Sequence, residues 1–192
     1  MHRLVAILAA VLAAYTCAPL ILGHETAARL LGPLAPDYVR EQVPVLAAHA
    51  FWDWTHRAGG AALLLVGLLQ LHSFRRWHRV IGYLYAALAT MMSLNGGWMA
   101  CTAPFSPDET LPALVFAVAL EGFVVLGIAA ARAGRMAEHR RWMQRSYAVA
   151  LGPLLVRMVH ILLAAGMSER DAMAPAFWYG WLLPLLVLEA RR

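Results

Sequence analysis

The sequence predicts an all-α polytopic membrane protein: a bundle of about six transmembrane helices with both termini on the cytoplasmic side. Its composition is the first reason, because 61% of the 192 residues are hydrophobic and only 14% are charged, well outside the range of soluble domains. Long apolar runs also recur along the chain at the length of a bilayer crossing. Finally, arginine is concentrated in alternate loops, which is the pattern of the positive-inside rule.

A transmembrane helix needs about 20 predominantly apolar residues. Six segments reach or approach this length, and the last is short enough to be tilted or partly interfacial. The first follows Met1, His2 and Arg3 and is long for a signal peptide, so we interpret it as a retained helix. All six belong to one integral membrane domain, residues 1–192. The predicted segments are 4–22, 50–74, 80–101, 111–131, 142–165 and 176–189.

The charges between these segments predict the orientation. Arg3 lies at the N-terminus, further arginines gather in the loops near residues 75–79 and 132–145 and at the C-terminus, and most acidic residues lie in the other loops. All six crossings then agree on one topology in the bacterial cytoplasmic (inner) membrane, with the arginine-rich side inside. The basic pI of 9.8 is thereby explained without nucleic acid. The outer loop 23–49 contains prolines and is long enough for a short surface helix.

Polar side chains at membrane depth are costly and therefore mark candidate sites. In segment 50–74, His49, His56 and Gln70 are spaced at multiples of seven, so they share one helix face that should point towards protein rather than lipid. For His49, simple hydrogen bonding between helices is the preferred interpretation. For His56, the sequence favours a structural role and a functional role equally.

The segment 142–165 and its cytoplasmic extension have a second polar face, which contains His139, Arg157 and His160. Pro153 on this face should kink the helix. Glu121 is the single acid within segment 111–131, at a depth that matches Arg157, so the two are predicted to form a buried ion pair. A structural pair is the preferred interpretation, and a proton or substrate relay is the alternative.

Histidines fall at two levels of the predicted bundle. His78 and His139 begin two helices at the cytoplasmic surface, and His56 and His160 lie near the outer surface. Each pair is a candidate for axial ligation of haem or for metal binding, and interaction of the inner pair with lipid phosphate is the alternative. His139 and His160 are 21 residues apart, about 31 Å along a helix, so they cannot share one site.

Other chemistry has no support in the sequence. There is no CxxCH motif for covalent haem attachment, and the two cysteines are too few for a zinc ribbon or a disulfide framework. Motifs of zinc proteases, serine hydrolases and nucleotide-binding proteins are also missing.

Two stretches carry a family resemblance. One is HRAGGAALLLVGLLQ with the later WHRVIGYLY, and the other is HRRWMQRSYA followed by Arg157. Over residues 50–160 the chain resembles the bacterial predicted membrane proteins called domain of unknown function 2306, and more distantly two-haem b-type cytochromes and membrane factors that assist oxidase assembly. The family pattern points to His56, Gln70, His78, Arg79, His139, Arg140, Trp142, Arg145 and Arg157.

Three functions follow as hypotheses. The first is a redox or electron-transfer protein that binds haem b or, alternatively, a transition metal. The second is a non-catalytic accessory or assembly subunit of a respiratory complex, with no cofactor and with glycine faces such as Gly59, Gly60 and Gly67 as partner contacts. The third is a small transporter or lipid-headgroup enzyme. In the first hypothesis, the candidate haem ligands are His56, His78, His139 and His160. A transition metal would instead use His56, His78 and His139. The arginines Arg79, Arg140 and Arg145 would bind haem propionates, quinone or lipid headgroups.

Overall fold

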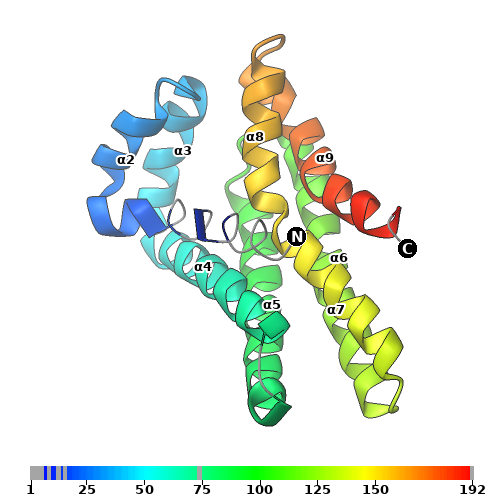
Figure 1. Cartoon of the computed structure of the whole chain (residues 1–192). Helices are drawn as coiled ribbons and strands as arrows, with labels where there is room; N and C mark the ends of the chain where they lie inside the picture. Colours follow the sequence, from blue (N-terminus) through cyan, green and yellow to red (C-terminus); the bar gives the residue numbers. More distant parts are fainter. Residues whose placement is uncertain (1–6, 8–9, 12–13, 15–16, 73–74, 191–192) are drawn as a thin grey trace.

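The computed structural model describes the chain except for residues 1–6, 8–9, 12–13, 15–16, 73–74 and 191–192. The predicted segment 4–22 lies largely outside the described residues, although residues 17–22 are helical. The described part of the chain is all α-helical, which confirms the predicted class (Figure 1). The elements are α2 (His24–Leu31), α3 (Pro36–Ala48), α4 (Ala50–His72), α5 (Arg75–Thr102), the 3₁₀ turn η1 (Pro107–Glu109), α6 (Thr110–Arg132), α7 (Met136–Ala150), α8 (Gly152–Ala164) and α9 (Glu169–Glu189).

The bundle is built from antiparallel neighbours along the chain. α4 packs on α5, α5 on α6, α6 on α7, and α8 on α9 (Figure 1). A tight turn joins α6 to α7, where Gly134 has a φ of +73° and the amide of Arg135 donates to the carbonyl of Ala130 at 2.9 Å. Glycine suits this position because side chains with a Cβ rarely adopt a positive φ. The core lies where α4, α5, α6, α7 and α9 meet, and its buried members include Leu63, Leu64, Tyr85, Ala89, Leu120, Val124, Tyr147, Val149 and Trp181.

Among the described residues, three helical stretches are long and apolar enough to cross a membrane. They are Pro107–Arg132, Met136–Ala164 and Glu169–Glu189. The final helix is therefore longer than the predicted segment 176–189. α4 and α5 are long enough to cross, but each mixes charged and polar residues with its apolar ones. Large hydrophobic side chains such as Leu94 (71% exposed), Val118 (72%) and Leu162 (73%) face outwards, as lipid-facing residues do.

The outer loop contains more structure than the sequence predicted, since 23–49 forms two helices, α2 and α3. Polar and aromatic contacts hold α3 against the start of α9 and the loop that follows α5. The amide of Tyr38 donates to Glu169 Oε2 at 2.9 Å, and the Tyr38 ring meets Phe105 edge-on at 5.5 Å. Arg170 and Glu41 form an ion pair between α9 and α3. These contacts fix α3 as a cap on the start of α9.

Near Pro153, where a kink was predicted, the structure divides the segment into two helices. α7 ends at Ala150, Leu151 forms the junction and α8 begins at Gly152. Pro153 has no amide hydrogen to donate, so the regular hydrogen-bond pattern cannot continue through this point. After the junction, α8 packs chiefly against α9.

The contact of α8 with α9 depends on glycine. A Cβ on Gly180 would lie 2.6 Å from the backbone nitrogen of Val156 and 2.7 Å from its Cα. Gly180→Ala should therefore push the two helices apart and lower the unfolding free energy by about 1–3 kcal/mol. Thermal unfolding in detergent would measure this effect. Gly96→Ala is the matched control, because a Cβ there meets nothing within 4 Å. Equal melting temperatures for the two variants would contradict the prediction.

Candidate functional site

The structure places the predicted histidines at two separate levels. At the inner level, His78 of α5 and His139 of α7 approach each other with ring centroids 6.3 Å apart and ring planes at 81°. Gln70, near the end of α4, joins this group, because its amide nitrogen donates to the carbonyl of His78 at 3.0 Å and lies 3.0 Å from His78 Nε2. Three helices thus meet at the predicted inner pair.

The hydrogen bond of His139 fixes which of its nitrogens carries the proton. Nδ1 lies 2.9 Å from the carbonyl oxygen of Gly127 on α6, and a carbonyl only accepts, so Nδ1–H is the donor. Neutral His139 therefore presents Nε2 as a lone-pair nitrogen. A backbone carbonyl on the second nitrogen is a common arrangement of metal-binding histidines.

His78 is also suited to the neutral form. Burial is the main cause that lowers the pKa of the His78 imidazole below its usual value, and a proton on the neighbouring His139 would lower it further. Lowering this pKa favours the unprotonated ring, which is the form that can ligate a metal.

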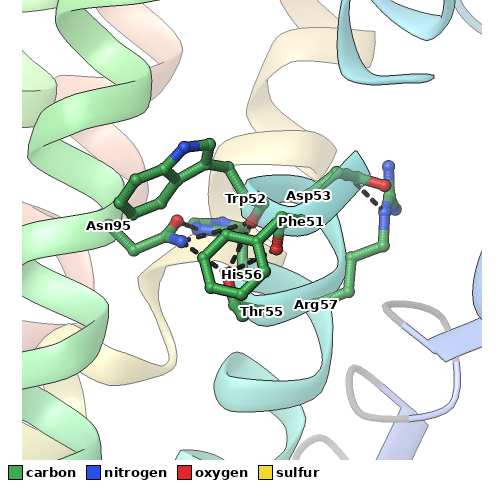
Figure 2. Close-up of polar contacts among 7 residues, drawn as sticks. All are labelled: Phe51, Trp52, Asp53, Thr55, His56, Arg57 and Asn95. Atoms are coloured by element: carbon green, nitrogen blue, oxygen red, sulfur yellow. Dashed lines mark hydrogen bonds and ion pairs between the residues drawn. The ribbon is translucent and has the colours of Figure 1, made fainter. Parts of the chain in front are cut away.

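At the outer level, His56 of α4 contacts Asn95 of α5 (Figure 2). The Asn95 amide nitrogen donates to the carbonyl of Trp52 at 3.2 Å and to Thr55 Oγ1 at 2.9 Å. Asn95 Oδ1 is therefore the acceptor of the 3.0 Å bond, and His56 Nδ1–H is the donor. The Trp52 ring stacks on Trp98, with ring centroids 4.4 Å apart, which closes this cluster on the outer side.

A buried ion pair lies beside this cluster. Figure 2 shows Asp53 and Arg57 on the side of α4 away from Asn95, with Arg57 Nε 2.7 Å from Asp53 Oδ1. Their side chains are 3% and 13% exposed. His56 is thus set among buried charges and amides rather than among other histidines.

The three histidines named as alternative metal ligands do not come together at one place. Gln70, which contacts His78, is 14 residues beyond His56 on the same helix, about 21 Å along its axis. His56 therefore cannot share an ion with His78 and His139. Within the described residues, no group of three or more His, Cys, Asp or Glu side chains is placed to hold a metal ion.

The predicted outer pair also has separate partners. His160 Nε2 donates to the backbone carbonyl of Glu169 at 3.0 Å, and the His160 ring meets Phe105 edge-on at 6.4 Å. His56 instead pairs with Asn95. The contacts of His160 tie α8 to the start of α9 and to the loop that contains Phe105.

In the described part of the chain, Glu121 and Arg157 do not form the predicted ion pair. Glu121 Oε1 accepts from Thr90 Oγ1 of α5 at 3.0 Å, whereas Arg157 Nη1 donates to the carbonyl of Pro153 at 2.9 Å. The break at Leu151 is the physical reason, because it allows α8 to pack on α9 and carries Arg157 with it. Matched depth along two helices did not imply that their side chains face each other.

The arginines of the inner face differ in their availability. Arg145 donates to both carboxylate oxygens of Glu189, at 2.8 and 3.1 Å, and its guanidinium lies 4.4 Å from the centroid of the Trp142 ring. Arg79 lies over Tyr83 at 5.9 Å, and Arg140 is exposed. Arg79 and Arg140 are thus better placed than Arg145 to bind an anionic group near the inner pair.

Asn95 is the site residue that the sequence reasoning missed. It is 3% exposed within a largely apolar helix and connects His56, Trp52 and Thr55. The signal was present, because a carboxamide between apolar residues and two glycines needs protein partners at membrane depth. Gln70 was singled out on similar grounds, and its predicted orientation towards protein is confirmed.

The comparisons with known proteins agree with this architecture. The profile of the family described as "Predicted membrane protein (DUF2306)" matches residues 54–190. The chain belongs to this family. The match covers both histidine levels and extends to the end of α9, further than the resemblance over 50–160. No curated protein and no solved structure matches the chain, so the distant likeness to b-type cytochromes has no support from relatives.

Proposed function

We propose that this member of the DUF2306 family is a redox protein of the bacterial inner membrane that binds one haem b, or else one transition-metal ion, between His78 and His139. The observation that carries the proposal is the inner pair: two imidazoles from different helices with ring centroids 6.3 Å apart. His78 and His139 would hold the group through their imidazole nitrogens, and the bound iron or other metal would supply one-electron redox chemistry.

The surroundings of the pair support the same interpretation. Gly127 holds the His139 ring in the tautomer that leaves Nε2 unprotonated. The Gln70 amide nitrogen can only donate, so neutral His78 also has an unprotonated Nε2, and a group bound through this nitrogen would replace the hydrogen bond from Gln70. Haem is the preferred occupant because Arg79 follows His78 and Arg140 follows His139, and these arginines would bind the haem propionates. With two protein ligands, a bare metal ion would need water or a second molecule to complete its coordination.

We further propose the six-span topology with both termini in the cytoplasm. In this arrangement α4 and α5 cross the membrane beside the three strongly apolar stretches, together with the segment 4–22. The inner pair then lies at the cytoplasmic surface, among the arginines that follow the positive-inside rule. An electron donor or a quinone would reach the centre from this side of the membrane.

The accessory-subunit alternative loses part of its basis. A Cβ on Gly59 would lie 2.3 Å from Met91 Cε, and one on Gly67 would lie 2.4 Å from the Tyr147 ring. These glycines are therefore occupied by contacts within the chain rather than available to a partner. Gly96 remains open, because a Cβ added there would meet no described atom within 4 Å.

An absorption spectrum of the detergent-purified protein, oxidised and dithionite-reduced, tests the proposal together with elemental analysis of the same sample. We expect a Soret band and a sharp reduced α-band, with one iron per chain. Copper, zinc or iron without a haem spectrum would retain the site and change its occupant. A colourless, metal-free protein from cells supplied with haem precursors and metals would refute the proposal and favour the accessory-subunit alternative.

A further inference from the structure

Glu121 is an acidic side chain in the middle of an apolar helix. It lies midway between Thr110 and Arg132 in α6, within a stretch that is long and apolar enough to cross a membrane. An ionised carboxylate at that depth is costly unless charges or several hydrogen bonds compensate it. Its contacts therefore decide which form of the carboxyl group the structure can hold.

Those contacts are few. Oε1 accepts one hydrogen bond, from Thr90 Oγ1 at 3.0 Å, while Oε2 is buried and has no hydrogen-bond partner in the described protein. A carboxylate that is stabilised as an anion usually accepts two or three hydrogen bonds or faces a cation. One neutral hydroxyl group is weak compensation for a full charge.

No cation replaces the missing partners among the described neighbours of α6. The facing side of α5 contributes Thr90, and from α7 His139 binds the carbonyl of Gly127, six residues nearer the inner end of α6. α9 has no charged residue between Asp171 and Glu189, and its titratable Tyr179 is exposed. Arg157, the predicted partner, donates to Pro153 on its own helix.

A second unpartnered polar atom lies on the same helix interface. Thr90 and Gly97 of α5 both face α6, since Thr90 binds Glu121 and a Cβ on Gly97 would lie 3.7 Å from Leu114. Ser93 lies between them on that face, and its Oγ is buried with no hydrogen-bond partner in the described protein. Buried polar atoms without partners are rare in native proteins, and two at one interface require an explanation.

We propose that Glu121 is a proton-binding site within the membrane. Its carboxyl group is held in the neutral acid form, Oε1 accepts from Thr90, and Oε2 carries the exchangeable proton. This inference does not depend on a bound haem or metal. It assigns to α5 and α6 a proton site at mid-membrane depth, far from the histidine pair at the inner surface.

Carbodiimide labelling tests the proposal on the full-length protein. The O–H bond of a carboxylic acid adds across a C=N bond of the carbodiimide, and the acyl group then migrates to nitrogen as a stable N-acylurea with no leaving group. Purified protein would be treated with lipophilic dicyclohexylcarbodiimide and analysed by peptide mass spectrometry. We expect the adduct on Glu121 in the unsubstituted protein and no adduct at position 121 in the near-isosteric Glu121→Gln variant. The control variant Glu138→Gln, which removes an exposed carboxylate, should still be labelled fully at Glu121.

A separate portion of the unsubstituted protein, treated only with a water-soluble carbodiimide, should be labelled at Glu138 and not at Glu121. An absence of lipophilic label from Glu121 would overturn the proposal, and so would labelling of Glu121 by both reagents to the extent of Glu138. Infrared spectroscopy gives an independent readout. A protonated carboxyl C=O band should disappear in Glu121→Gln and move to higher frequency in Thr90→Val, which removes the hydrogen bond to that carbonyl. A spectrum with no such band would also overturn it.

Discussion

His139→Ala should remove the bound haem or metal from the purified protein, and His78→Ala should do the same. Each imidazole supplies one of the two protein ligands in the proposed centre, so the loss of either leaves a single bond to the group. We expect near-complete loss of the absorption bands, or of the metal by elemental analysis. His49→Ala and His160→Ala are controls, because His49 lies edge-on to Trp98 and His160 binds the carbonyl of Glu169.

Loss of the bound group must be separated from loss of the fold. His139→Gln is useful here, because an amide can still donate to the carbonyl of Gly127 while it lacks the imidazole ligand. We expect this variant to remain monodisperse and to lack the spectrum. Free imidazole added to His139→Gly should restore the bands by occupying the vacated space. Bands that persist unchanged in both His78→Ala and His139→Ala would contradict the assignment of these ligands.

Asp53→Ala should cause the largest loss of stability among the single substitutions considered. It removes the carboxylate that lies 2.7 Å from Arg57 Nε, and it leaves a guanidinium that is only 13% exposed. Breaking a buried pair from one side typically costs about 3–5 kcal/mol, because the remaining charge is desolvated without compensation. Chemical or thermal unfolding in detergent would measure the loss.

Two comparisons sharpen this prediction. Asp37→Ala breaks the exposed pair with Arg40, whose side chains are 45% and 70% exposed, and should cost no more than about 1 kcal/mol. The double variant Asp53→Leu/Arg57→Met replaces both charges by apolar groups and should regain much of the stability. Equal losses for Asp53→Ala and Asp37→Ala would show that the buried pair contributes no more than a surface pair.

Much of the fold was predictable because bilayer crossing imposes a simple rule on the chain. The apolar runs predicted α4, α5 and α6 to within a few residues of their observed limits, and Pro153 predicted the break between α7 and α8. The two helices of the outer loop were only partly anticipated. They depend on contacts such as Tyr38 with Phe105 and Glu41 with Arg170, which join segments far apart in the sequence.

The candidate site was predictable in part for a related reason. Helical spacing correctly indicated that His56 and Gln70 face protein, and it placed His78 and His139 at one level, where the structure brings them together. Spacing along single helices could not show which faces meet. The pairing of Glu121 with Arg157 therefore failed, and the link between His56 and Asn95 was missed.

The sequence by itself determined the all-α membrane class, the approximate helix limits and the position of each polar residue along its helix. These properties follow from local composition and from the rise of about 1.5 Å per residue of a helix. Only the tertiary structure decided the partners: His78 with His139, His56 with Asn95, and Glu121 with Thr90. The physical reason is that partners depend on how each helix is rotated about its axis and which neighbour it packs against. Side-chain packing between helices sets both, through contacts such as those of Gly67 with Tyr147 and Gly180 with Val156.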